Sequence, residues 1–527
     1  MVLGFSTVVL AETTNNVDST ETIQVLGESY RNTAAKKSLE AQETPQAITI
    51  IDGEELDQRG VQSLNQALRY APGVITETKG GAVTMYDTCS IRGFSSEQSY
   101  YDGLLLQSLN GWNLQPQINP IAMQQVEVFK GPTSILYGSM PPSGMVNMIA
   151  KSPQQESNTE FNIATGSRNL IQESFDSTGQ IGTSNLSYRF IGLAKQQDGQ
   201  VDGTEEQRFV IAPSLDWQVT DDTLINFNLY YQNDPEMGMN SSLPASGMIY
   251  SNANGSTSSS TFAGDTNWSS FEREVLMLGY KVDHKFSDSW SFLQNARYTD
   301  SSLSQKNTYH LESGFEETTG DLSRNIYSTE EESKGFVIDN QLSGYVYTGD
   351  VEHNLLFGAD YQKLEGDSVY KEYATSESRF YEFNIFNANN NLLNTNNMSE
   401  VYEGKDEISV EQLGFYFQDQ MRWDRLVVIA GGRYDLYKSK STYSDAYGSS
   451  ESDAAHGQFS YRLGALYEFD NGIAPFASFA TSFEPATGLD GDGNGFNPEM
   501  GQQVEVGIKH QTADRRFNSF ASLFHIT

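Results

Sequence analysis

The stretch that decides the fold is residues 125–153, QVEVFKGPTSILYGSMPPSGMVNMIAKSP. Apolar alternation over 126–128 predicts a short strand, and Lys130-Gly131-Pro132 predicts a tight break after it. One helical turn over 134–137, a Gly/Pro loop and a second apolar strand over 145–149 follow. These elements predict the end of a compact α+β unit.

The sequence changes character after this unit. Residues 159–527 read almost throughout as long strands of alternating polarity. In 186–190 (LSYRF), for example, Leu, Tyr and Phe alternate with Ser and Arg, so one face is apolar and the other polar. We therefore place a domain boundary near 154–158 and expect function where the two domains meet.

The connections between these strands sort by length. Short turns are predicted at 182–185, 220–222, 287–289, 348–350, 423–425 and 470–472. Between them, long polar connections are predicted at roughly 232–269, 301–331, 366–406, 440–456 and 484–500. Short turns on one rim and long loops on the other are typical of a transmembrane β-barrel, whereas a soluble β-sandwich has no reason to sort its loops in this way.

Composition excludes some classes of function. The 527 residues carry a net charge of −36, which argues against a nucleic-acid partner. The acidic excess is explained by a solvated surface, or by loops that bind divalent cations at a lipopolysaccharide surface. Cys89 is the single cysteine, so no intrachain disulfide is possible. No apolar run reaches the length of a membrane helix.

No pattern of an enzyme emerges. The six histidines are scattered, and no nucleophile triad, metal-ligand cluster or phosphate-binding loop is present in the sequence. Residues 490–494 (DGDGN) resemble the start of a calcium loop, but the glutamate expected six positions beyond the glycine is missing, so a plain turn is predicted. We expect no catalysis, no cofactor and no bound metal.

The stretch 125–153 closely resembles the end of the plug domain of TonB-dependent outer-membrane receptors. Residues 43–51 (ETPQAITII) are similar to the first plug strand, 63–74 (SLNQALRYAPGV) to its helix and Pro-Gly stop, and 91–94 and 101–103 to its strand-loop signatures. The residues that carry the plug motifs are Arg92, Gly93, Phe94, Asp102, Gly103, Glu127, Gly131, Pro132, Tyr137, Gly138, Gly144 and Asn147.

The resemblance implies a mainly β fold, with an α+β plug inside a transmembrane antiparallel β-barrel. The family closes its barrel with about twenty-two strands, and we count about fifteen here. We therefore expect about seven C-terminal strands to be missing and the wall to be gapped. The domain division follows: 1–11 as a signal-peptide remnant, 12–42 as a disordered tail, 43–156 as the plug and 157–527 as a partial barrel.

The tail contains one isolated alternating segment, Glu21-Thr22-Ile23-Gln24-Val25. Such a segment can add as a strand to the sheet edge of a partner, with Ile23 and Val25 filling pockets. By position it resembles the TonB box, which implies TonB as a periplasmic partner.

The resemblance also implies a ligand site at the plug apex. The subgroup that the chain most resembles takes up ferric hydroxamates such as ferrichrome, which are best held by aromatic walls and a few donors. Lys79 lies near the place of a ligand-binding arginine of the family, offset by one residue. Each aromatic candidate has loop packing as its alternative. The candidate ligand-binding residues are Lys79, Tyr86, Gln98, Tyr100, Tyr101, Trp112 and Tyr309.

We therefore expect a monomeric importer of ferric siderophore in the lipid and lipopolysaccharide of the outer membrane, with plug and tail facing the periplasm. Residues 239–242 lack aromatics that relatives can place there, which allows a cargo other than ferrichrome. Haem or cobalamin as cargo, a passive porin or adhesin, a soluble β-rich binding protein and a truncated non-functional product remain as alternatives.

Overall fold

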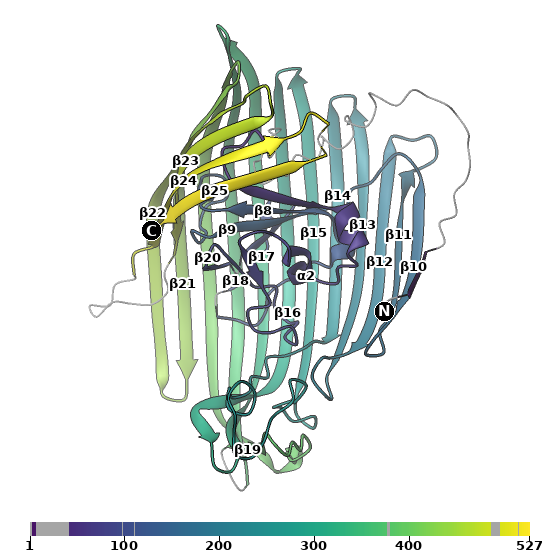
Figure 1. Cartoon of the computed structure of the whole chain (residues 1–527), viewed down its shortest axis with the longest axis vertical. Helices are drawn as coiled ribbons and strands as arrows, with labels where there is room; N and C mark the ends of the chain where they lie inside the picture. Colours follow the sequence, from purple (N-terminus) through teal and green to yellow (C-terminus); the bar gives the residue numbers. More distant parts are fainter. Residues whose placement is uncertain are drawn as a thin grey trace.

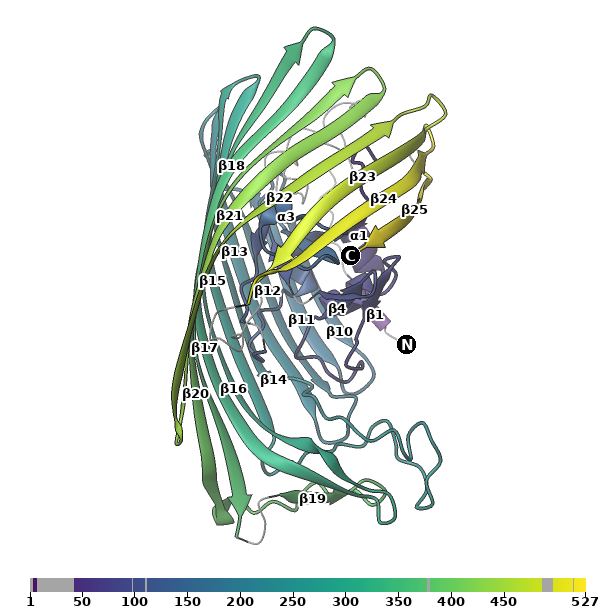
Figure 2. The same cartoon turned by 90° about the vertical axis from the view of Figure 1, so that its left-hand side faces the viewer.

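The computed structural model describes residues 3–6, 42–96, 98–109, 111–376, 380–485, 496–514 and 516–527, and the side chains of all of these except 3–6 and 312–313. Its largest part is a 17-stranded antiparallel sheet. The sheet forms a tall curved wall, and a small mixed domain, the plug, lies on its concave side (Figures 1 and 2). Fold class is therefore mainly β with an α+β plug.

Fifteen long strands make up the wall. They follow the chain as neighbours, and two short strands add to them: β1 (Leu3–Ser6) beside β10, and β19 (Tyr381–Asn384) beside β17. The wall strands are β10 (Asn158–Thr165), β11 (Ile171–Gln180), β12 (Leu186–Asp198), β13 (Glu205–Thr220), β14 (Thr223–Glu236), β15 (Ser270–Ser287), β16 (Trp290–Glu316), β17 (Asp321–Thr348), β18 (Val351–Thr375), β20 (Met398–Trp423), β21 (Leu426–Asp445), β22 (Gly448–Tyr467), β23 (Ile473–Glu484), β24 (Glu499–Gln511) and β25 (Asn518–Ile526).

The wall is not closed. Among the described residues, β1 and β25 are the two ends of the sheet and do not pair with each other. Figure 2 shows the resulting open side. Both the expected number of wall strands and the expected gap are confirmed.

All six predicted short turns join neighbouring strands. Two of the five predicted long connections also hold: 237–269 between β14 and β15, and, within the predicted 366–406, residues 376–397 between β18 and β20, which contain the short strand β19. The predicted connection 484–500 lies mostly outside the described residues. The other two were wrong: most of 301–331 and 440–456 lies in strands that extend the hairpins β16–β17 and β21–β22. Polar residues dominate these extensions, so the apolar alternation that marks a strand fades there although backbone pairing continues.

The plug has two sheets. Five strands run in the order β2-β8-β9-β6-β7 and three in the order β3-β4-β5. The predicted strand, helical turn and second strand of the deciding stretch are confirmed as β8, α3 and β9. The plug elements are β2 (Ile48–Asp52), α1 (Gly53–Gln58), α2 (Leu64–Leu68), β3 (Val74–Thr76), β4 (Cys89–Ile91), β5 (Phe94–Ser96), β6 (Ser99–Tyr101), β7 (Leu104–Leu105), a 3₁₀ turn (Pro120–Ala122), β8 (Met123–Lys130), α3 (Ser134–Tyr137) and β9 (Gly144–Ala150).

Local chemistry explains the short helices. The carboxylate of Asp52 accepts from the backbone N–H of Glu55 at 2.8 Å, and the hydroxyl of Ser63 accepts from Gln66 at 3.3 Å. These N-caps start α1 and α2 by satisfying free N–H groups. In the described residues, no helix is long and apolar enough to cross a membrane.

One apolar core joins the plug to the wall. Val126, Val128 and Met148 of the plug belong to the same buried cluster as Val275 and Met277 of β15. Burial of this surface favours a plug that is held against the wall rather than one that floats beside it.

Several motif residues are needed for the plug's own geometry. Gly144 has φ +113°, and a Cβ there would lie 1.9 Å from the carbonyl oxygen of Phe129, so only glycine fits. The Asn147 side chain accepts from the Gly103 N–H and donates to Glu127, both at 3.0 Å. These contacts tie β9 to β8 and to the turn after β6.

Other motif residues bind the plug to the wall. Arg92 donates to Glu505 on β24 at 2.5 Å. Asp102 pairs with Lys281 on β15 at 3.0 Å and also accepts from the Ala150 N–H at 2.8 Å.

Candidate functional site

The predicted site residues Lys79 and Tyr86 lie together on the plug loop between β3 and β4. The Lys79 ammonium sits 4.2 Å from the centre of the Tyr86 ring. The Tyr86 hydroxyl donates to the side-chain oxygen of Asn113 in the next plug loop. Because Tyr86 also packs among Met85, Leu114 and neighbouring apolar side chains, its ring is held in one place and only 9% exposed.

The second plug loop connects this pair to the wall. The carboxylate of Glu331 on β17 accepts from the backbone N–H of Leu114 at 2.7 Å and from the Asn113 amide at 3.4 Å. Trp112, one residue earlier, packs between Leu109 and Leu364 of β18 in an apolar cluster. The Lys79–Tyr86 pair is therefore linked to β17 through Asn113, and Trp112 packs against β18.

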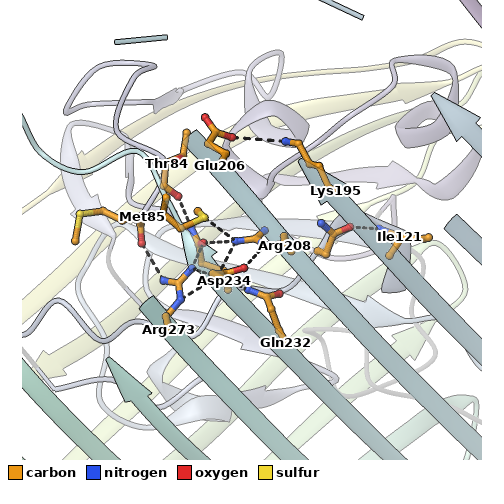
Figure 3. A network of polar contacts seen from close by, with 12 residues as sticks. Thr84, Met85, Ile121, Lys195, Glu206, Arg208, Gln232, Asp234 and Arg273 are labelled. Atoms are coloured by element: carbon orange, nitrogen blue, oxygen red, sulfur yellow. Dashed lines mark hydrogen bonds and ion pairs between the residues drawn. The ribbon is translucent and has the colours of Figure 1, made fainter. Parts of the chain in front are cut away.

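A buried ionic network fixes the loop that carries Tyr86 (Figure 3). Asp234 of β14 accepts from Arg208 of β13 and from Arg273 of β15, each at 2.6 Å. Arg273 also donates to the main-chain carbonyl of Met85 at 3.0 Å. Buried charges are tolerated when they are paired and hydrogen-bonded, as these are.

Two further contacts complete this attachment. The backbone of Thr84 donates to the Gly238 carbonyl at 2.8 Å, and the Gly238 N–H donates back to the Thr84 hydroxyl at 2.9 Å. The Gln117 side chain, from the second plug loop, accepts from Arg208 at 2.8 Å. Both plug loops are therefore held against the wall by the ionic network of Arg208, Asp234 and Arg273 and by the backbone at Gly238.

Four tyrosines that the sequence analysis missed lie on the same face of the wall as Glu331. Directly opposed residues of antiparallel strands share a face. Three rows of paired residues cross the strands β17, β18, β20 and β21 in that order. The first row is Tyr327, Glu372 and Tyr402, and the second is Thr329, Tyr370, Gly404 and Asp445. The third row is Glu331, Ser368, Asp406 and Tyr443. Glu331 contacts the plug, so the face that carries all three rows is the inner face of the wall. The rows of Thr329 and Tyr327 lie next to the row of Glu331, farther along the strands. We call Tyr327, Tyr370, Tyr402 and Tyr443 the tyrosine patch.

The members of the tyrosine patch touch one another. The rings of Tyr327 and Tyr370 stack with centres 5.8 Å apart, and Tyr370 meets Tyr402 edge-on at 6.3 Å. The hydroxyls of Tyr402 and Tyr443 are hydrogen-bonded. All four rings are partly exposed, so they offer an aromatic surface with polar tips.

The remaining predicted residues lie elsewhere. Tyr100 and Tyr101 are 2% and 8% exposed and pack edge-on against Tyr137 and Tyr230, respectively. Their positions favour core packing, the alternative weighed for each aromatic. Gln98 is half-buried, with its Oε1 unpaired among the described residues, and Tyr309 is 45% exposed on β16, beside His310. The TonB-box segment 21–25 lies outside the described residues.

Comparison with known proteins identifies related chains. Residues 40–145 match the model of the TonB-dependent receptor plug domain, and residues 213–527 match that of the TonB-dependent receptor-like β-barrel. The chain is 33% identical to the ferrichrome outer membrane transporter/phage receptor of Escherichia coli K12, covering 94% of this chain and 68% of that protein. It is 31% identical to the ferrioxamine B receptor of Salmonella typhimurium SL1344, covering 92% of this chain and 68% of that one.

The solved structures agree on the fold. The siderophore receptor PiuA of Acinetobacter baumannii superposes with a TM-score of 0.79 at 21% identity, over 92% of this chain and 72% of that one.

Proposed function

The chain belongs to the family of TonB-dependent receptors, and on that premise we propose that it imports a ferric siderophore, of the hydroxamate type, across the outer membrane. The family consists of outer-membrane receptors and transporters rather than enzymes. The relatives named above are receptors for ferrichrome and ferrioxamine B, both hydroxamates.

The observation that carries the proposal is that plug aromatics and wall tyrosines lie on the same inner side of the sheet, linked through Glu331. A ferric hydroxamate is a compact, oxygen-rich complex in an organic shell, which suits tyrosine faces with a few donors. On the plug side the proposed contacts are Lys79, Tyr86 and Trp112, the two aromatic rings being 9% exposed each and so offering only an edge. The tyrosine patch is the proposed wall side. Gln98 and Tyr309 remain proposed contacts, whereas the burial of Tyr100 and Tyr101 supports a packing role for them.

The proposed transport step depends on the orientation of the receptor and on a ligand-dependent state of its tail. We infer that the long hairpins face the exterior and that the short turns, plug base and tail face the periplasm. Ligand bound at the plug apex favours a state in which residues 21–25 are available to TonB, which requires different affinities for the ligand in the two states. TonB then pulls on the tail and remodels the plug.

The last part of the proposal concerns the oligomeric state of the receptor and the membrane around it. The receptor acts as a monomer, with lipid and lipopolysaccharide around the wall. Apolar and aromatic side chains such as Phe357, Phe415 and Phe417 are exposed on its strands, as expected for a lipid-facing band.

A binding experiment tests the ligand class. The complete receptor in detergent is titrated with a ferric trihydroxamate and with a ferric catecholate, and quenching of its aromatic fluorescence is followed. Saturable quenching by the hydroxamate at micromolar concentration or below, and weaker quenching by the catecholate, is the expected result. Tighter binding of the catecholate would contradict the hydroxamate assignment, and binding of neither would contradict siderophore import.

A further inference from the structure

The inner rows that carry the tyrosine patch are rich in hydrogen-bond acceptors and carry negative charge. Four carboxylates share these rows with the tyrosines: Glu331, Glu372, Asp406 and Asp445. The Asp445 carboxylate accepts from the Tyr443 hydroxyl at 3.2 Å and lies 3.3 Å from the Tyr402 hydroxyl, which is also hydrogen-bonded to Tyr443. Glu372 accepts from Tyr370 at 3.2 Å. Tyrosine hydroxyls therefore donate to Asp445 and Glu372, and the hydroxyl oxygens keep the capacity to accept.

Two buried side chains in the same place hold acceptor atoms without a partner. Gln305 and Thr329 oppose each other across β16 and β17, on the inner face between the tyrosines. They are 1% and 6% exposed, and Gln305 Oε1 and Thr329 Oγ1 have no hydrogen-bond partner among the described residues. The Gln305 amide already donates to the Tyr327 hydroxyl at 3.3 Å, so its carbonyl oxygen is left to accept. Unpaired buried polar atoms are costly: the Gln305 oxygen lacks a donor, and the Thr329 hydroxyl lacks any partner, to which it can donate or from which it can accept.

Among the described residues of the wall, no cation in these rows supplies that donor. The described residues that share these rows on β16, β17, β18, β20 and β21 include no lysine or arginine. Lys371 follows Tyr370 but belongs to the opposite face, where it pairs with Glu400 and Glu403 at 2.8 and 3.1 Å. Lys79 of the plug has its ammonium over the Tyr86 ring.

We propose that this acceptor-rich patch selects a ferric hydroxamate that carries a protonated amine over neutral and anionic chelates. The inference rests on the proposed function and specifies its cargo. An ammonium group has three donors and no acceptor, which complements the carboxylates and the unpaired oxygens of Gln305 and Thr329. It is also attracted to tyrosine faces, whereas a triply charged catecholate complex is repelled by the same carboxylates.

A matched pair of ligands isolates this charge. The first is a linear ferric trihydroxamate with a free terminal amine, and the second is the same complex after N-acetylation, which keeps the iron centre and removes the charge. Both are titrated against the complete receptor in detergent at low and high salt. The amine form should bind about tenfold more tightly at low salt, and the preference should shrink at high salt because screening weakens charge interactions.

Paired variants locate the effect. The double variant Glu372→Gln/Asp406→Asn should reduce the preference to nearly one, and an unchanged thermal unfolding midpoint in detergent shows that the receptor is still folded. Glu407→Gln is the control, because Glu407 follows Asp406 in sequence but is exposed on the opposite face of β20.

The outcomes separate the two proposals. Equal binding of both complexes by the unmodified receptor overturns this inference and leaves siderophore import standing. An equal loss of preference in the Glu407→Gln control overturns it as well, because the charge would then act without regard to the patch. Binding of neither complex contradicts the proposed function itself.

Discussion

Arg273 on β15 donates a hydrogen bond of 3.0 Å to the main-chain carbonyl of Met85, and so joins the wall directly to the plug loop that carries Tyr86. Arg273 and Met85 are both fully buried. The same guanidinium pairs with Asp234. Arg273 therefore neutralises a buried carboxylate of the wall and also positions the plug loop that carries Tyr86.

Replacing Arg273 should loosen that loop. Arg273→Ala leaves Asp234 with the Arg208 ion pair and the Gln232 amide, and it removes the donor to Met85. Removing one partner of a buried ion pair is strongly destabilising. We expect amide hydrogen exchange over 84–88 to become about tenfold faster and siderophore binding to weaken. Arg425→Ala is the control, because Arg425 pairs with Asp470 at an exposed turn. Unchanged exchange over 84–88 would contradict the role given to Arg273.

Tyr86 should contribute to binding through its ring and its hydroxyl separately. Tyr86→Phe removes the hydrogen bond to Asn113 and should weaken binding about fivefold, a typical effect for one such bond. Tyr86→Ala also removes the ring beneath Lys79 and should weaken binding further. Titration of the receptor variants with a ferric trihydroxamate measures both. Tyr447→Ala, at a tip residue that is 90% exposed, should bind like the unmodified receptor.

Gly144 should tolerate no side chain. Gly144→Ala places a Cβ against the Phe129 carbonyl at a φ of +113°, and should make the plug far more sensitive to protease while the wall stays resistant. Gly81→Ala is a matched control, since its Cβ would meet neighbours only at 3.6 Å and beyond. A protease-resistant plug in Gly144→Ala would show that the geometry around β9 is wrong.

Asp87 should make the plug loop sensitive to pH. Burial raises the pKa of its carboxyl from 3.8 to about 6, Arg208 and Arg273 oppose the rise, and Asp234 adds to it. The Asp87 Oδ1 is buried without a partner among the described residues. A folded-state pKa above the unfolded value means that Asp87's contribution to stability is full below pH 3.8 and is lost as the pH rises through about 6.

Hydrogen exchange over 84–88 should therefore be slower at pH 5 than at pH 7, after correction for intrinsic exchange rates. Asp87→Asn, which cannot ionise, should remove the difference. A pH effect of the same size in Asp87→Asn would assign it to another group.

How much the sequence predicts depends on whether a segment has an apolar face. Residues 125–153 alternate around glycines that the backbone requires, so β8, α3 and β9 were predicted correctly. Around Tyr327 the chain reads NIYSTEEES, which is too polar to show an alternating apolar face, so the sequence predicts a loop there. The inward row of tyrosines becomes visible only through the strand register. Conversely, Tyr100 and Tyr101 were predicted in the site on residue type, although β6 places them in packed interiors.

The most direct test of the account is iron uptake by an iron-starved, receptor-null Gram-negative strain that carries the gene's complete reading frame. The strain carries the receptor either unmodified or with residues 21–25 deleted. It is supplied with radiolabelled iron as a linear trihydroxamate. The account predicts uptake that is saturable and lost with the deletion, although the deleted receptor still binds the complex. Uptake that persists without residues 21–25, or no uptake of any ferric siderophore, would contradict it.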